Sequence, residues 1–165
     1  MMRLIFFAAL IALAACTQST TKENSRKVLA QGDSALLLPK INIVTANGDS
    51  VNISTLKGPL VLILFTPDCD HCQREATDIA NHFELFKNYT LYFIAAQTND
   101  VLQEFAGKYN LGDKSNVVFA QGPIVPVIKT LKPTSMPTIL IYNEGGVLIK
   151  RFDGETKVED IKEFL

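Results

Sequence analysis

The chain has 165 residues, with 16 basic and 17 acidic side chains, a formal net charge of −1 and three cysteines. This length suits a single domain with a sizeable core. The near balance of charge excludes the strongly basic surface that nucleic-acid binding or electrostatic attraction to an anionic membrane requires.

The first residues are typical of a secretory leader. Residues 1–15 contain Arg3 and then an uncharged apolar run that is too short to span a bilayer as a permanent helix. The small residues before Cys16 resemble the lipobox of bacterial lipoproteins, in which that cysteine is acylated and becomes the first residue after cleavage. The resemblance implies a lipid anchor on Cys16 and an extracytoplasmic, membrane-anchored lipoprotein that faces the periplasm or cell envelope.

The next segment separates this anchor from the folded part of the chain. Residues 16–32 are polar and lack apolar periodicity, so they are predicted to form a flexible tether, followed by one domain over residues 33–165. No later segment is long and apolar enough to cross a membrane. With Cys16 assigned to the anchor, Cys69 and Cys72 are the remaining thiols, and outside the cytoplasm disulfides form and persist.

The first half of the domain shows clear periodicities. Residues 41–54 hold two short alternating runs around Asn47-Gly48, which predicts a hairpin. Residues 59–65 are continuously apolar, as in a strand buried on both faces. In residues 69–86 the apolar positions recur three and four apart, which predicts a helix with one buried face.

The remaining elements alternate in type. A second hairpin is expected around the Asn-Glu-Gly-Gly turn at residues 143–146. The other predicted elements are strands over 90–96, 117–120, 138–142 and 147–152, and helices over 100–109, 124–131 and 157–165. This order predicts an α/β fold, a mixed central sheet with helices on both faces.

The segment Cys69-Asp70-His71-Cys72 carries the strongest chemical signal. Cys69 follows a buried strand and begins a helix, where unpaired backbone N–H groups and the positive end of the helix dipole stabilise a thiolate. Cys72 lies one turn later on the buried face, within reach of a disulfide with Cys69. The spacing therefore predicts a redox pair in which Cys69 attacks and Cys72 resolves the mixed disulfide.

Together with its surroundings, this unit resembles the TlpA/ResA-like branch of the thioredoxin superfamily. The resemblance covers residues 38–165 and includes the approach VNISTLKGPLVLILF, the Cys-x-x-Cys motif, a glutamate three residues after it (Glu75), and Met136-Pro137-Thr138 before a strand. It implies a thioredoxin-like fold with an added N-terminal β-hairpin. It also implies a thiol-disulfide oxidoreductase that acts on extracytoplasmic protein disulfides or dithiols, without a cofactor or metal.

The resemblance also implies roles for individual residues. Pro137 in a cis bond would place the backbone of Met136 beside Cys69, so that Met136 and Thr138 offer an edge to a substrate peptide. Glu75 would act as the active-site acid that relays the proton of the buried thiol. The alternatives are a trans turn proline and an exposed helix glutamate.

The residues between the cysteines act on the redox pair in opposite directions. A cationic His71 would favour the Cys69 thiolate, while the carboxylate of Asp70 would oppose it. The family's tryptophan before the first cysteine is replaced by Asp68. A histidine before the second cysteine is shared with oxidising DsbA-like proteins, so the direction of electron flow stays open. We expect a reductant, and by family analogy a membrane protein that donates its electrons.

Three alternative functions use the same residues. Cys69 and Cys72 with a histidine, His71 or His82, would suit Cu(I) in a soft-metal carrier, whereas a closed zinc site needs four ligands and a second cysteine pair that the chain lacks. Thr66 and Cys69 have the Thr-x-x-Cys spacing of a peroxiredoxin-like peroxidase. The third alternative is a binding module with a structural disulfide.

Overall fold

A computed structural model describes residues 36–165 of the chain. They belong to one compact unit, Asp33–Leu165. The predicted leader, the tether and the lipidation site Cys16 lie outside the described residues. Within the described residues, no helix has the length and apolar character needed to cross a membrane.

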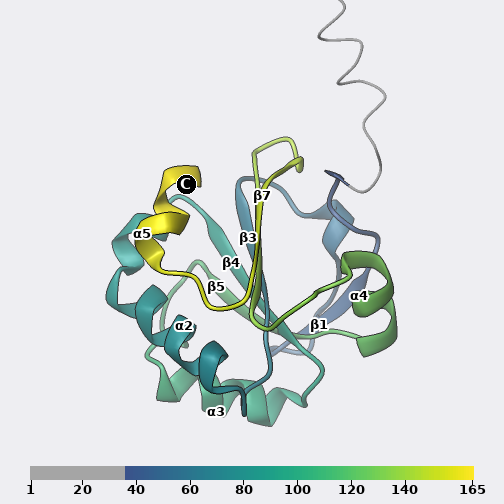
Figure 1. The fold of residues 1–165 in the computed structure, drawn as a ribbon. Helices are drawn as coiled ribbons and strands as arrows, with labels where there is room; N and C mark the ends of the chain where they lie inside the picture. Colours follow the sequence, from purple (N-terminus) through teal and green to yellow (C-terminus); the bar gives the residue numbers. More distant parts are fainter. Residues whose placement is uncertain (1–35) are drawn as a thin grey trace, which may run out of the picture. The chain divides into compact units, whose positions relative to one another are not determined.

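Residues 36–165 contain a seven-stranded sheet in the order β2-β1-β5-β4-β3-β6-β7 (Figure 1). The strands are β1 (Asn42–Thr45), β2 (Ser50–Asn52), β3 (Leu60–Leu64), β4 (Thr90–Ala95), β5 (Val117–Gln121), β6 (Thr138–Tyr142) and β7 (Leu148–Asp153). The helices are α2 (Asp70–Asn81), α3 (Asn99–Lys108), α4 (Ile124–Leu131) and α5 (Val158–Ile161), with 3₁₀ turns η2 (Ile53–Thr55), η3 (Phe83–Phe86) and η4 (Lys162–Phe164).

The pairing of the strands confirms the predicted mixed sheet. Strands β3, β4 and β5 are parallel to one another, and β6 runs antiparallel to β3 with Thr138 opposite Leu64. The predicted N-terminal hairpin, β1 with β2, adds to the sheet beside β5, and β7 follows β6 as the other hairpin. Its turn uses Gly146 at φ 72°, a conformation that glycine adopts without steric cost.

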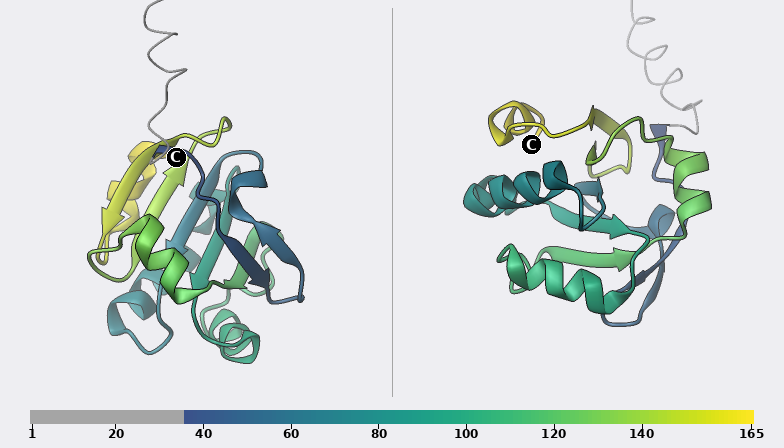
Figure 2. Two further views of the ribbon diagram at one scale, coloured as in Figure 1. Left: turned by 90° about the vertical axis from the view of Figure 1, so that its right-hand side faces the viewer. Right: turned by 60° about the horizontal axis from the view of Figure 1, so that its bottom comes forward.

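The two faces of the sheet carry separate apolar layers because side chains alternate along each strand. In β3, Val61 and Ile63 belong to the layer beneath α2, α3 and α5, whereas Leu60, Leu62 and Leu64 belong to the layer beneath α4. Figure 2 shows these helices on opposite sides of the sheet. All five residues of β3 are buried, as its continuous apolar run predicts.

The predicted helix over residues 69–86 is shorter in the structure. Helix α2 ends at Asn81, and His82 follows with φ −114° and ψ 27°. The His82 ring nitrogen Nδ1 lies 3.0 Å from the carbonyl oxygen of Asp78, so the side chain competes for a helix acceptor. The chain then tightens into η3, which buries Phe86 completely. The predicted C-terminal helix is likewise a short α5 followed by η4.

Candidate active site

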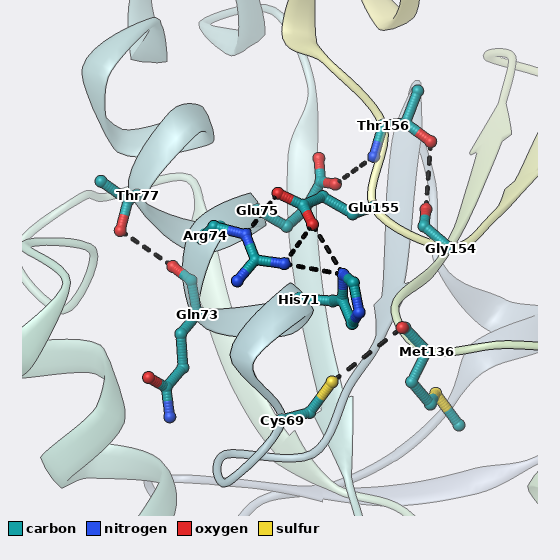
Figure 3. Close-up of polar contacts among 10 residues, drawn as sticks. All are labelled: Cys69, His71, Gln73, Arg74, Glu75, Thr77, Met136, Gly154, Glu155 and Thr156. Atoms are coloured by element: carbon teal, nitrogen blue, oxygen red, sulfur yellow. Dashed lines mark hydrogen bonds and ion pairs between the residues drawn. The ribbon is translucent and has the colours of Figure 1, made fainter.

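Cys69 lies where the central strand passes into a helix. It is the N-cap residue of α2, with extended backbone angles, and its carbonyl accepts the N–H of Gln73. Its side chain is half-buried, and its Sγ lies 4.0 Å from the carbonyl oxygen of Met136 (Figure 3). The thiol thus has solvent access and lies at the N-terminal end of the helix, beside a backbone carbonyl.

Cys72 has the opposite environment. It lies one turn into α2, is 2% exposed, and packs in the apolar layer with Ala76 and Ile79. Burial raises the pKa of the Cys72 thiol to about 12, and the hydrogen bond with Cys69 acts in the same direction. Both thiols are free. The pair therefore combines one accessible sulfur and one sheltered sulfur.

The loop before β6 brings a third group to the cysteines. The Met136–Pro137 peptide bond is cis, as the resemblance implied. The Thr138 side chain is buried, and its hydroxyl lies 2.6 Å from the carbonyl oxygen of Ser135 and 2.8 Å from the carboxylate of Asp153. The Thr138 side chain therefore holds the loop in place, whereas Met136 is the residue whose backbone reaches Cys69.

Glu75 is buried on α2, one turn beyond Cys72. Its side chain is 1% exposed, so the alternative of an exposed helix glutamate is wrong. The Oε2 atom accepts the backbone N–H of Thr156 at 2.7 Å, and Oε1 has no hydrogen-bond partner among the described residues. Burial raises the pKa of Glu75 to about 7. This carboxyl can therefore exchange a proton near neutral pH.

Glu75 lies at the wall of a surface groove of about 320 Å³. The groove runs between α2 and the segment after β7, and its other lining residues include Arg74, Asp78, Glu155 and Lys157. In the structure the N–H of Val158 also donates to Asp78 at 3.0 Å, which ties the two walls together. The groove leads from solvent to the side of α2 that carries the buried carboxyl.

Three charged or ionisable side chains meet at the exposed side of the cysteine motif (Figure 3). Arg74 donates from Nε to Glu155 Oε1 at 2.8 Å and from Nη2 to Oε2 at 2.6 Å. His71 Nδ1 lies 2.7 Å from the same Oε2 and 2.8 Å from Arg74 Nη2. Nδ1 therefore lies between an acceptor and a donor: it donates to Glu155 when it carries a hydrogen and accepts from Arg74 when it does not. The Arg74 and His71 hydrogen bonds lower the pKa of Glu155 to about 2.

Sequence reasoning placed His71 and Asp70 at the motif but missed Arg74 and Glu155. Asp70 is the first residue of α2 and is exposed. The residues of the pair Arg74–Glu155 are 81 positions apart in the chain. The only local signal was that Arg74 lies one helical turn after His71, on the same side of the helix.

The metal-site alternative has little geometric basis in the described residues. No group of three or more histidine, cysteine, aspartate or glutamate side chains in residues 36–165 is arranged to hold a metal ion. His71 is bound to Glu155, and His82 lies at the far end of α2 beside Asp78. The predicted sulfur–histidine ligand set is therefore not assembled in this structure.

Comparison with protein families agrees with this geometry. A family model described as AhpC/TSA matches residues 36–154, which include the cysteine motif and the cis-proline loop. The chain belongs to the AhpC/TSA family. The match confirms the predicted thioredoxin-like class of the domain, whose mixed sheet and flanking helices are described above.

Among the proteins similar to this AhpC/TSA chain are a thiol-disulfide oxidoreductase and a disulfide oxidoreductase. It is 27% identical over 128 residues to the thiol-disulfide oxidoreductase ResA of Halalkalibacterium halodurans, covering 72% of this chain and 67% of the relative. A secreted Mycobacterium tuberculosis disulfide oxidoreductase homologous to E. coli DsbE matches with a TM-score of 0.62 and 22% identity, over 80% of this chain and 96% of that chain. Arabidopsis thaliana ScoI, solved with copper bound, matches with a TM-score of 0.62 and 12% identity, over 74% and 91% respectively. The two structural matches show a shared fold.

Proposed function

We propose that the chain is a thiol-disulfide oxidoreductase of the cell envelope that reduces disulfides in extracytoplasmic proteins. The observation that carries this proposal is the asymmetric pair: a half-buried Cys69 at a helix start beside the Met136 carbonyl, and a Cys72 that is 2% exposed. The ResA relative, which carries this activity in its name, supports the same enzyme class.

The exchange begins at Cys69. Its thiolate attacks one sulfur of a partner's disulfide, a new S–S bond forms to Cys69, and the other partner sulfur leaves as a thiolate that takes up a proton. The Met136 carbonyl, 4.0 Å from Cys69 Sγ, lies at the edge where an extended partner segment would align its backbone. Cys72 cannot make this first attack because it is buried.

The second step uses Cys72. Its thiolate attacks Cys69 Sγ, the mixed disulfide breaks, and the second partner sulfur leaves and is protonated. Two electrons and two protons have then passed to the partner, and the chain holds a Cys69–Cys72 disulfide. A thiol whose pKa is raised to about 12 needs a base for this step. Glu75, one turn away with a pKa of about 7, is the carboxylate that takes the proton.

The direction and the location are the finer parts of the proposal. The cysteine motif, the buried Glu75 and the cis-Pro137 loop are arranged as the TlpA/ResA-like resemblance implied. This supports a reductant, which a membrane protein carrying a dithiol would recharge. We further propose anchorage through lipid on Cys16, which the leader-like residues 1–15 support. The partner proteins are those that present an accessible disulfide.

Matched serine variants and a redox titration test the proposal. Wild-type chain is expected to reduce a disulfide-bonded peptide, Cys69→Ser to be inactive, and Cys72→Ser to accumulate the mixed disulfide. Equilibration with glutathione or dithiothreitol should give a reduction potential near or below about −230 mV, whereas a value near about −120 mV would mark an oxidant. Full activity in Cys69→Ser, or peroxide reduction in place of disulfide reduction, would contradict the assignment.

A further inference from the structure

The segment that follows β7 contributes a carboxylate to the cysteine motif from outside it. Glu155 reaches the first turns of α2 and binds Arg74 through two hydrogen bonds of 2.8 and 2.6 Å. Its Oε2 atom also lies 2.7 Å from Nδ1 of His71, the residue that precedes the second cysteine. A carboxylate that binds a guanidinium through two parallel hydrogen bonds fixes the orientation of the guanidinium and also offsets its charge.

Arg74, whose charge Glu155 offsets, lies on the helix that begins at the reactive thiol. Arg74 is cationic at every physiological pH, and Cys69 is one of the groups whose charge acts on it. A cation at this position favours the Cys69 thiolate, and thereby stabilises the reduced form of the pair. A carboxylate beside the cation cancels most of this effect.

We propose that Glu155 is a positioning residue that keeps the cysteine pair reducing, by compensating the charge of Arg74 and fixing the ring of His71 beside the motif. The inference rests on the proposed function, because it concerns the reactivity of Cys69 in disulfide exchange. It adds to that function a residue 81 positions away from Arg74, on a segment that carries no cysteine-motif signature.

The other charged groups near the motif do not pair with Arg74 and His71 as Glu155 does. Asp70 is exposed at the start of α2 and its charge also acts on Arg74, but among the described residues no hydrogen bond links its side chain to Arg74 or His71. A second groove, of about 370 Å³, is lined by His71, Glu155 and Lys157, and Lys157 adds positive charge there. Among the described residues, Glu155 is the carboxylate that binds both Arg74 and His71.

A double-mutant cycle on Arg74 and Glu155 tests the inference in the full chain. The readouts are the pH dependence of Cys69 alkylation and the reduction potential, measured at an ionic strength of about 0.05 M to limit screening. Cys72 does not interfere, because burial raises the pKa of its thiol to about 12.

The two single variants are expected to move both readouts in opposite directions. Glu155→Gln leaves Arg74 uncompensated, so alkylation of Cys69 below the midpoint of its pH profile should become about threefold faster and the potential should rise. Arg74→Gln leaves the carboxylate uncompensated, so alkylation should slow and the potential should fall. The double variant should return close to wild type, and Glu155→Asp, which keeps the charge, should stay closer to wild type than Glu155→Gln.

Glu144→Gln is the matched control, because Glu144 is exposed in the turn after β6, at the opposite end of the sheet from Cys69. It should leave both readouts unchanged. If both single variants shift the potential in the same direction, or if Glu155→Gln behaves like the control, the inference is wrong although disulfide exchange persists. If wild-type chain forms no reversible Cys69–Cys72 disulfide, it is the proposed function that fails.

Discussion

Replacing Glu75 with glutamine should make the free energy of unfolding depend less on pH. The carboxyl has a pKa of about 7 in the folded chain and an ordinary value of 4.5 when unfolded. Between these values the folded state holds a proton that the unfolded state has lost, so the free energy of unfolding falls as pH rises through this window. At about 1.4 kcal/mol for each pKa unit, the loss approaches about 3 kcal/mol.

Glu75→Gln removes this titration and retains an oxygen for the N–H of Thr156. Urea unfolding of the reduced chain at pH 4.5 and pH 8 gives the stability of each variant. The free energy of unfolding of Glu75→Gln minus that of wild type should increase by about 3 kcal/mol between pH 4.5 and pH 8. Glu144→Gln, an exposed substitution, controls for loss of one carboxylate. A difference that does not change with pH would refute the reasoning.

Three further substitutions probe the packing and the hydrogen bonds of the fold around the site. Asp153→Asn should cost about 1–2 kcal/mol in urea unfolding at pH 7, because the Arg151 hydrogen bond lowers the pKa of Asp153 from 3.8 to about 2. That stability is present above about pH 4 and is lost as pH falls towards 2, so equal stability of both chains at pH 7 would contradict it. Gly122→Ala should lower stability by about 1–3 kcal/mol, since a Cβ there would lie 2.7 Å from Ile94 Cγ2. In contrast, Gly107→Ala in α3 meets nothing within 4 Å and should raise stability by about 0.5–1 kcal/mol in thermal unfolding.

Local patterns predicted the elements that carry the cysteines. The continuous apolar run of β3 and the three-and-four spacing in α2 depend only on neighbouring residues, so they placed Cys69 at a strand-to-helix junction and Cys72 on a buried face. The burial of Glu75 also had a local signal, because it precedes Ala76 and follows Cys72 by one turn, beside the apolar stripe. Such features follow from periodicity.

Other features depend on contacts that no periodicity records. The apolar spacing continues through Phe83 and Phe86, so it could not show that α2 ends at Asn81 and that a 3₁₀ turn follows His82. Glu155 reaches Arg74 only because β7 returns alongside β6 and directs the following segment towards α2. A pairing between residues so far apart in the chain requires knowledge of the whole sheet.

The sheltered position of Cys72 has a consequence for small thiols in solution. Cys72 shares one buried apolar cluster with Phe65 and Ile79, so glutathione or a similar monothiol can form an adduct at Cys69 alone. In the proposed exchange, Cys72 would then attack Cys69 and release the adduct as a free monothiol, which leaves the internal disulfide. The packing of the core would thus let the chain free a blocked Cys69, after which the internal disulfide still needs the dithiol that recharges the pair.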